Sequence, residues 1–278
     1  MGNILWIASY PKSGNTWVRS FIQNYLSNQR SDINDMHRQS IDEVKSFRYQ
    51  PYLSADQTTT DLDLTTICAI RPNVHADIAA AAQGTVFVKS HNFQGQYENY
   101  PLHNWSVSSG AIYVVRNPLD VAVSLSHYFD YTIDDAISYM ADDMAGTPNE
   151  PENVPQIITS WSLNVSSWTQ EPRNNLLVLR YEDLLKNPKK YFRKVESLLG
   201  LKKDPKRLTK AIHASSFKNL KQQEQQSGFV EKHENAGAFF RSGTANQWQK
   251  VLSKEQVERL VNDHREQMER FKYIPPGY

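Results

Sequence analysis

The strongest constraint on the fold is the stretch of residues 4–17, where a short apolar run leads into a turn and then into a helical pattern. Residues 4–8 are apolar throughout, which is typical of a buried strand. Pro11 and Gly14 indicate a tight turn. From Asn15 onward apolar residues recur with the period of a helix; they are Trp17, Val18, Phe21, Ile22, Tyr25 and Leu26. The stretch therefore predicts a strand, a turn and a helix in direct succession.

A turn of this kind, at the N-terminus of a helix, forms an anion site. The first N–H groups of the helix have no partner inside it, and the helix dipole directs its positive end at the turn. Lys12 adds a positive charge, while Ser13 and Thr16 add hydroxyl donors, so the expected ligand is a phosphate group. The loop differs from that of nucleoside triphosphatases, because Lys12 precedes the only glycine of the loop instead of following the second. The alternative is an ordinary strand, turn and helix with a surface lysine.

Three further apolar runs predict strands, at residues 85–89, 111–116 and 176–181, with helices between them. This alternation predicts an α/β fold, a single domain with a central parallel sheet flanked by helices. Ligands of such sheets bind beyond the carboxyl ends of the strands. The side chains expected at that rim are Lys12, Lys89, His91, Arg116 and Tyr181.

The remaining patterns are weaker. Residues 31–72 are polar and irregular, either a substrate-contacting excursion or plain surface, with one weak strand candidate at 66–70. The segment 222–247 is rich in Gln, Gly and Asn, and we expect it to be mobile, as a lid would be. Helices are expected at 73–82, from Pro118, at 157–168, at 188–199, from Pro205, and after a capping box at Ser253–Gln256.

Length and composition limit the class of protein. The 278 residues suit one large domain, which we take as residues 1–278, and the net charge of +1 argues against nucleic-acid binding. Cys68 is the only cysteine, so no internal disulfide is possible and a reducing compartment is expected. No apolar run approaches the roughly 20 residues of a membrane span, and the first strand leaves no room for a signal peptide. We therefore expect a cytoplasmic protein without membrane contacts.

The order Tyr-Pro-Lys-Ser-Gly-Asn-Thr-Trp at residues 10–17 resembles a known loop. It is similar to the 5′-phosphosulfate loop of the cytosolic-type sulfotransferases that use 3′-phosphoadenosine 5′-phosphosulfate (PAPS), where Thr stands in place of Asn15. Lys89-Ser90-His91 resembles the Lys-x-His of the same family, whose His is the catalytic base. Histidine suits that role because its unperturbed pKa lies nearest neutrality. The resemblance implies that His91 is the base and that Lys12 and Lys89 contact the phosphosulfate.

Two later segments resemble the family's 3′-phosphate elements. Residues 116–124 follow the pattern Arg-Asn-x-x-Asp-x-x-x-Ser, so Arg116 and Ser124 are expected to bind the 3′-phosphate. Residues 241–243 resemble a late Arg-Lys-Gly, with Arg241 and Gly243 matching and Ser242 in place of the Lys. One cation is therefore missing from this clamp.

The adenosine contacts are also implied by the resemblance. Tyr181-Glu182-Asp183 resembles the family's Tyr-Glu-Asp, whose Tyr contacts the nucleotide, and Ser215-Ser216-Phe217 resembles Thr-Ser-Phe beside the adenine. Trp17 and Phe217 would be the aromatic groups against the base, or else ordinary core residues. The expected nucleotide-binding residues are Lys12, Ser13, Gly14, Asn15, Thr16, Trp17, Arg116, Ser124, Tyr181, Ser215, Phe217, Arg241, Ser242 and Gly243.

The resemblance implies transfer of a sulfuryl group from PAPS to a hydroxyl of a small-molecule acceptor, which leaves 3′-phosphoadenosine 5′-phosphate (PAP). An amine acceptor is less favoured, and no metal is implied. A nucleotide kinase or triphosphatase, or a PAP-binding protein without activity, are the alternatives. Four aromatic residues are candidates for an acceptor pocket or for core positions: Phe93, Tyr128, Phe129 and Tyr131. Only Glu258 remains of the family's dimerisation motif, so we expect a monomer or a different dimer.

Overall fold

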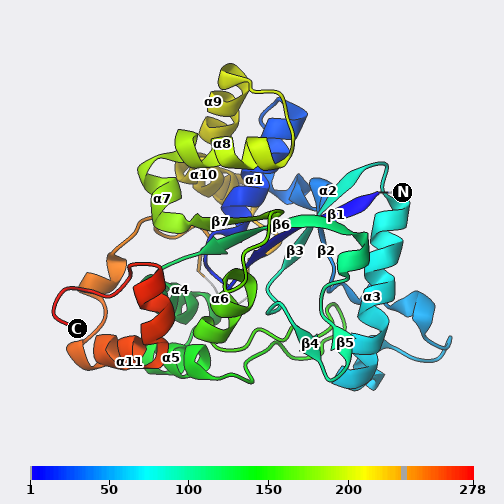
Figure 1. Cartoon of the computed structure of the whole chain (residues 1–278), viewed down its shortest axis with the longest axis horizontal. Helices are drawn as coiled ribbons and strands as arrows, with labels where there is room; N and C mark the ends of the chain where they lie inside the picture. Colours follow the sequence, from blue (N-terminus) through cyan, green and yellow to red (C-terminus); the bar gives the residue numbers. More distant parts are fainter. Residues whose placement is uncertain (1, 233–236) are drawn as a thin grey trace.

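Five parallel strands form the central sheet in the order β2-β3-β1-β6-β7 (Figure 1). The computed structural model describes residues 2–232 and 237–278. The strands are β1 (Asn3–Ser9), β2 (Ser40–Asp42), β3 (Thr85–Ser90), β6 (Ser108–Val115) and β7 (Leu176–Arg180); a separate hairpin pairs β4 (Gln96–Tyr97) with β5 (Tyr100–Pro101). The predicted parallel α/β sheet is thus confirmed, and all four strands expected from the sequence belong to it.

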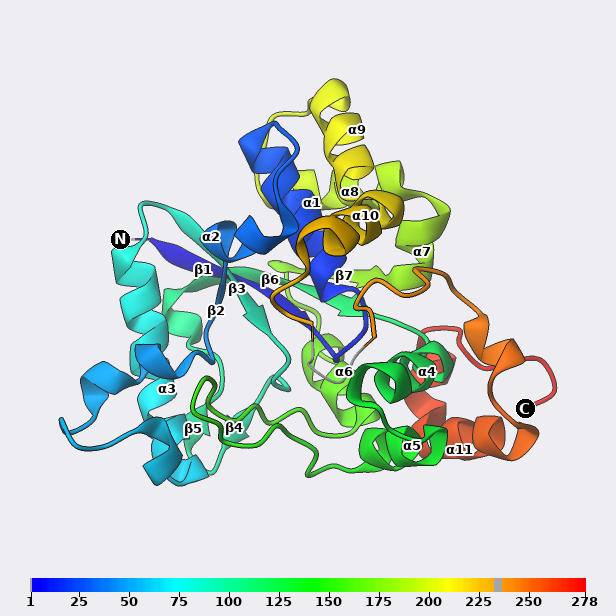
Figure 2. The ribbon, with the colours of Figure 1, turned by 180° about the vertical axis from the view of Figure 1, so that it is seen from behind.

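Helices pack against both faces of the sheet. Side chains of the central strand β1 alternate between the two faces, so each face has a core of its own. Ile4, Trp6 and Ala8 of β1 face one core, built with α3, α4, α5, α6 and α11. Leu5 and Ile7 face a second core, built with α1, α8 and α9. Figures 1 and 2 show the sheet between these two layers. The helices are α1 (Asn15–Ser27), α2 (Met36–Gln39), α3 (Leu64–Ala81), α4 (Pro118–Phe129), α5 (Ile133–Ala141), α6 (Trp161–Thr169), α7 (Tyr181–Lys186), α8 (Pro188–Leu198), α9 (Pro205–Ala214), α10 (Phe217–Ser227) and α11 (Lys254–Arg270).

Local signals placed several helices correctly. Helix α1 starts at Asn15, as predicted, directly after the left-handed Gly14. The Asn117 side chain accepts a hydrogen bond from Leu119 N at the start of α4. The capping box at Ser253 opens α11. Short 3₁₀ helices connect other elements, at Ile33–Asp35, Ser46–Arg48, Gln50–Tyr52, Thr59–Asp61, Trp105–Val107 and Gln247–Lys250.

The strand predicted at residues 66–70 is wrong, because these residues lie in α3. The helix begins well before the predicted residue 73, since the Asp63 carboxylate accepts a hydrogen bond from Thr66 N and caps it. The β-branched run at 65–67 suggested a strand, but the cap and the core contacts of Ile67 favour the helix. Strand β2 lies in the supposedly irregular excursion, and its three residues are too few for a periodic signal.

Two other boundaries need correction. Helix α10 extends to Ser227, so the irregular chain expected from residue 222 begins later, and residues 233–236 lie outside the described part of the chain. Helix α6 begins at Trp161, several residues after the predicted 157, where the Ser160 hydroxyl caps it. Helix α5, which the sequence patterns did not indicate, starts with a capping box at Thr132 and Asp135.

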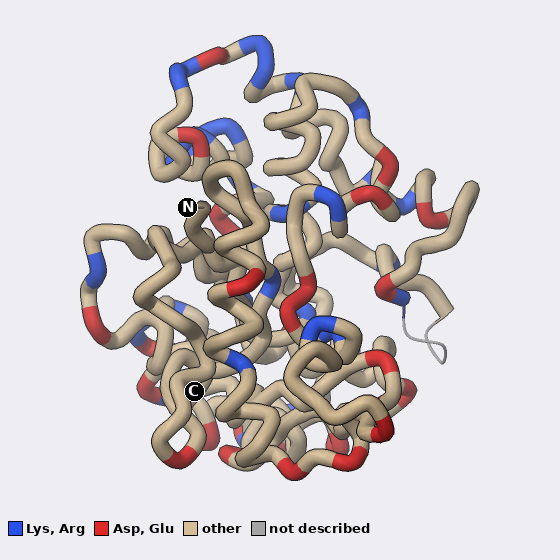
Figure 3. The backbone as a smooth tube through the Cα atoms, turned by 90° about the vertical axis from the view of Figure 1, so that its right-hand side faces the viewer, with Lys and Arg blue, Asp and Glu red and all other residues tan. Residues whose placement is uncertain are grey.

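The near-neutral net charge conceals an uneven distribution. Lys and Arg gather at the upper end of Figure 3, where α8 and α9 lie, and acidic residues gather at the lower end, around α5 and α11. Within the described residues, no helix has the length and apolar character needed to cross a membrane.

Candidate active site

A cavity of about 970 Å³ lies at the carboxyl ends of the strands. Its walls include Lys12 after β1, Lys89 and His91 at the end of β3, Arg116 after β6 and Tyr181 after β7. These are the five side chains that the sequence places at the rim, so the predicted convergence is confirmed. Three Lys or Arg side chains that the sequence analysis did not select also line it: Arg19, Lys45 and Lys232.

The loop after β1 depends on two left-handed residues, Lys12 with φ 63° and Gly14 with φ 111°. A Cβ on Gly14 would lie only 2.8 Å from Cδ2 of Tyr181, so this position requires glycine for both backbone and space. Nζ of Lys12 lies 3.7 Å from the ring centre of Tyr128 and 4.0 Å from that of Phe239. Burial, and then the charge of Arg116, lower the pKa of Lys12 to about 7. The amino group thus lies against two perpendicular aromatic rings, and a bound anion would raise its pKa and favour the charged form.

The first turn of α1 combines structural and exposed groups. Asn15 Nδ2 donates to the carbonyl oxygen of Ile7 over 2.8 Å, which ties the helix to β1 and gives this departure from the family loop a structural role. Asn15, Thr16 and Trp17 line the cavity, and Trp17 contacts Tyr181 edge-on at 5.7 Å. Ser13 is fully buried and does not line the cavity; its hydroxyl has no hydrogen-bond partner among the described residues.

His91 has a defined tautomer. Its Nδ1 lies 2.8 Å from the carbonyl oxygen of Ser9. A carbonyl can only accept, so Nδ1 carries the proton and Nε2 of the neutral ring holds the free electron pair. Burial, followed by the charge of Lys89, lowers the pKa of His91 to about 4. The imidazole is therefore neutral at pH 7 and can accept a proton at Nε2.

Lys89 lies in an ion network that the sequence analysis missed. Its Nζ is 3.2 Å from Oδ2 of Asp42 and 3.6 Å from Oε2 of Glu231, and Glu231 in turn pairs with Arg19 at 2.7 Å. Burial alone would lower the pKa of Lys89, but the two carboxylates outweigh it and raise the pKa. The pKa of Glu231 is lowered, since Lys89 and Arg19 overcome the effect of its burial. Lys89 therefore stays charged.

Arg116 links the first loop to the late segment. Its Nη1 donates to the carbonyl oxygen of Lys12 at 2.9 Å and its Nη2 to that of Thr244 at 3.3 Å. The guanidinium lies 4.5 Å from the ring centre of Tyr181. Ser124 of α4 also lines the cavity. The structure thus brings the two predicted 3′-phosphate residues of this segment into the same cavity.

The late segment closes the cavity through Arg241, Ser242 and Gly243, all of which line it. Gly243 has φ 65°, and a Cβ there would lie 2.1 Å from Cδ2 of Phe217, so the backbone passes directly over that ring. Arg241 donates to the side chain of Gln247.

Asp120, the Asp of the pattern at residues 116–124, anchors the chain just after this segment. It is fully buried and accepts hydrogen bonds from the backbone N–H of Asn246 at 2.7 Å and of Trp248 at 3.1 Å. No local pattern relates residues so far apart in the chain, so the sequence carries no signal of this contact.

The remaining predicted residues divide between the cavity and the core. Phe217 lines the cavity, but Ser215 is fully buried and donates to the carbonyl oxygen of Ala211, while its neighbour Ser216 reaches the wall. Of the four candidate acceptor residues, the wall includes Tyr128, Phe129 and Tyr131 and does not include Phe93.

Comparison with known proteins agrees with this geometry. Residues 3–272 match the sulfotransferase domain family. Human sulfotransferase 1C2 is 26% identical over 275 residues, which cover 95% of this chain and 83% of that protein. Dog sulfotransferase 1B1 is 27% identical over 274 residues, covering 94% and 82% respectively.

Solved structures share the fold. Mouse sulfotransferase SULT7A1 complexed with PAP aligns with a TM-score of 0.63 at 19% identity, over 96% of this chain and 84% of that one. Retinol dehydratase, in complex with androsterone and PAP, aligns with a TM-score of 0.64 at 17% identity, over 95% and 80%. Because the family match spans nearly all of the sequence, the chain belongs to the sulfotransferase family.

Proposed function

We propose that this enzyme transfers a sulfuryl group from PAPS to a hydroxyl group of a small-molecule acceptor, with His91 as the base. The observation that carries the proposal is the position of a neutral histidine, with a free electron pair at Nε2, in the same cavity as the ammonium groups of Lys12 and Lys89. An amine acceptor would use the same geometry.

The donor would bind along the part of the cavity between the loop after β1 and the late segment. Backbone N–H groups at the start of α1, with Lys12 and Thr16, would hold the 5′-phosphosulfate. Arg116, Ser124 and the segment 241–243 would hold the 3′-phosphate. The aromatic wall for the adenine would be Trp17, Tyr181 and Phe217, with Ser216 beside them.

The reaction would follow an in-line course. The acceptor oxygen attacks sulfur, the bond from sulfur to the bridging phosphate oxygen breaks, and its electron pair leaves with PAP. The acceptor proton passes to Nε2 of His91. Lys12 and Lys89 stabilise the negative charge that develops on the bridging oxygen, as preorganised cations in a dry site do.

The acceptor would occupy the side of the cavity formed by α4 and by residues 147–158. This wall combines Tyr128, Phe129 and Tyr131 with Pro148 and Ile158. The aromatic rings and the aliphatic side chain of Ile158 favour a phenol or a hydrophobic alcohol, because small-molecule sites are lined mainly by aromatic and apolar side chains.

The direct test follows release of PAP from PAPS with 4-nitrophenol, a primary alcohol and a primary amine as acceptors. His91→Ala should lower kcat by a factor on the order of 10² or more, as loss of a general base does. Its affinity for PAP should match the wild type, because His91 is not among the proposed nucleotide contacts. The exposed His213 supplies a matched control, since His213→Gln should leave both quantities unchanged.

A protein that binds PAP without turnover is the second reading to exclude. A PAP concentration of 100 times the dissociation constant would raise the free energy of unfolding of such a protein by roughly 2.7 kcal/mol. No PAP would be released from PAPS with any of the acceptors. Stabilisation by ATP with magnesium and not by PAP would contradict the proposed donor.

A further inference from the structure

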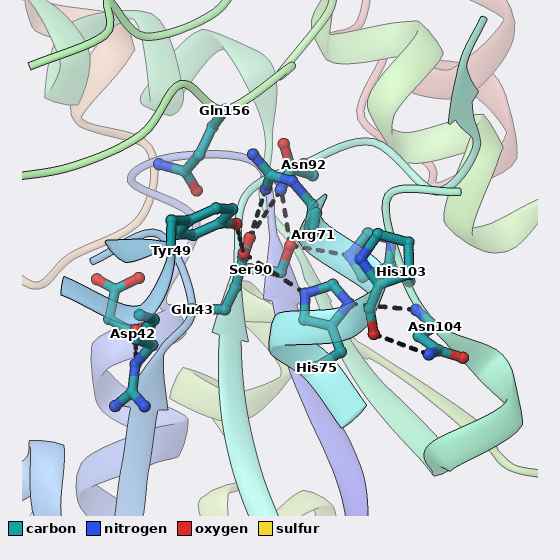
Figure 4. Close-up of polar contacts among 12 residues, drawn as sticks. Asp42, Glu43, Tyr49, Arg71, His75, Ser90, Asn92, His103, Asn104 and Gln156 are labelled. Carbon is teal, nitrogen blue, oxygen red and sulfur yellow. Dashed lines mark hydrogen bonds and ion pairs between the residues drawn. The ribbon is translucent and has the colours of Figure 1, made fainter. Parts of the chain in front are cut away.

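A buried polar cluster surrounds the carboxylate of Glu43 (Figure 4). It consists of Glu43, Tyr49, Arg71, His75 and Asn92, and we call it the Glu43 cluster. One of its members, Asn92, directly follows His91 in the chain. Glu43, Tyr49, Arg71 and His75 are fully buried, and Asn92 is 1% exposed. None of the five belongs to the cavity wall. The cluster is therefore a second layer beneath the active site.

The Glu43 carboxylate is the centre of this cluster. Oε1 accepts hydrogen bonds from Nη1 of Arg71 at 2.7 Å and Nδ2 of Asn92 at 3.0 Å. Oε2 accepts one from the Tyr49 hydroxyl at 3.1 Å and lies 3.5 Å from Nε2 of His75. Burial would raise the pKa of Glu43, but Arg71 outweighs it and lowers the pKa to about 2. The carboxylate is thus ionised and fully surrounded by donors.

The cluster is joined to the cavity through neighbours in the chain. Glu43 follows Asp42, the partner of Lys89, and Asn92 follows His91. Successive side chains of an extended chain point to opposite sides, so one residue of each pair faces the cavity and the next faces the cluster. Fixing Glu43 and Asn92 therefore fixes the backbone that carries Asp42 and His91.

The same cluster holds a third part of the cavity wall. Nη2 of Arg71 donates to the carbonyl oxygen of Pro155 at 2.6 Å, and Ile157 N donates to Oδ1 of Asn92 at 2.7 Å. Between them lies Gln156, which lines the cavity and accepts a hydrogen bond from His91 N at 3.3 Å. The backbone groups of Asn92 are occupied as well, by the Ser90 hydroxyl and the Trp168 indole.

Such a cluster is a weak source of stability. Desolvating a buried ion pair costs about as much as the pairing returns, and apolar residues of similar volume often stabilise a core as well or better. A cluster that fixes the chain on which Asp42, His91 and Gln156 lie is instead suited to setting the geometry of the cavity wall.

We propose that Glu43 and Asn92 are positioning residues for sulfuryl transfer, which hold the His91 imidazole with Nδ1 on Ser9 and Nε2 toward the acceptor oxygen. The kinetic part of this inference rests on the proposed role of His91 as the base. The structural part concerns the imidazole itself and can be measured without an acceptor.

Asn92→Ala tests the link between the cluster and His91, because it removes the bonds to Glu43 and from Ile157 N. With 4-nitrophenol as the acceptor, kcat should fall about tenfold or more, since small displacements of a reacting group are costly. The dissociation constant of PAP should stay within about twofold, because the proposed nucleotide contacts lie on other elements.

The matched control is Asn24→Ala. Asn24 is 3% exposed and also makes two side-chain hydrogen bonds to the backbone, to Ser20 O at 2.8 Å and from Ser31 N at 2.9 Å. It lies toward the end of α1 and not on the cavity wall. We expect a comparable loss of stability with kcat unchanged, which separates positioning from destabilisation.

The ¹⁵N chemical shifts of the His91 ring supply the readout that needs no acceptor. The wild type and Asn24→Ala should show a single tautomer protonated at Nδ1, and Asn92→Ala should show a mixture. If Asn92→Ala does not fold, Tyr49→Phe removes one bond to Glu43 with the ring packing kept, and should shift the tautomer and kcat in the same direction.

An unchanged tautomer and an unchanged kcat in these variants would overturn the proposal. A wild-type enzyme that has no turnover with any acceptor would count against the proposed function, whereas the tautomer would still decide whether Glu43 and Asn92 position the ring.

Discussion

The guanidinium of Arg116 donates a hydrogen bond to the carbonyl oxygen of Lys12 over 2.9 Å, so the cation after β6 holds the loop after β1 in place. The same side chain bonds Thr244 O and faces the ring of Tyr181. One residue thus couples three of the segments that meet at the cavity. It has a structural role in the loop beside its proposed role on the 3′-phosphate.

Arg116→Ala should therefore lower the binding affinity for two ligands, PAP and ADP, to different extents. We expect a loss of about 2–3 kcal/mol for PAP, typical of charge-assisted hydrogen bonds, and a smaller loss for ADP, which has no 3′-phosphate. Calorimetric titration of both ligands measures the difference. Equal losses for the two ligands would show that Arg116 acts only through the loop. Arg116→Lys keeps the positive charge but not the bidentate guanidinium, so its affinity for PAP should lie between those of the wild type and Arg116→Ala.

Lys12 should take up a proton when PAP binds. Its pKa of about 7 means that the free amine is mostly neutral at pH 8, whereas a bound phosphate raises the pKa and favours the ammonium form. Titrations at pH 8 in buffers of different ionisation enthalpy should show uptake of close to one proton, and titrations at pH 6 should show little. Lys12→Arg is charged at both pH values, so it should lose the uptake; an uptake that persists in this variant would assign the proton to another group.

His91 should make stability depend on pH. Its folded pKa of about 4 lies below the value of about 6.5 for an unfolded histidine, so the unfolded chain binds more protons between these values. Stability contributed by neutral His91 is present above about pH 6.5 and is lost as the pH falls toward 4. Between pH 7 and 5 we expect the wild type to lose about 1–2 kcal/mol more than His91→Gln in urea unfolding. Parallel curves for the wild type and His91→Gln would contradict the assignment.

Gly14→Ala should be strongly destabilising. The backbone has φ 111°, and the added methyl would lie 2.8 Å from Cδ2 of Tyr181. Strain of this kind costs about 1–3 kcal/mol, before any movement of the ring is counted. Chemical denaturation gives the value. Gly200→Ala, at φ 64° with no atom within 4 Å of the new Cβ, isolates the backbone part, so a similar loss in both variants would mean that the contact with Tyr181 is unimportant.

The sequence by itself determined four of the five strands of the sheet, the loop after β1 and the chemistry at the strand ends. Residues 4–17 encode a strand, a turn and a helix through local rules, because burial periodicity and glycine conformation act within a few residues. Since the carboxyl ends of parallel strands meet at one edge, the sequence alone assigns five side chains to one rim: Lys12, Lys89, His91, Arg116 and Tyr181.

Only the tertiary structure decided which partners these groups meet. Arg19 and Glu231 pair across 212 positions of the chain, and Asp120 anchors a segment more than 120 positions away. The Glu43 cluster, likewise, draws its members from the chain just after β3, from α3 and from the excursion that seemed irregular. Long-range ion pairs and hydrogen bonds follow no period in the sequence. They form only where folding removes water and brings separate segments within about 3 Å, which is why the second layer of this active site could not be foreseen.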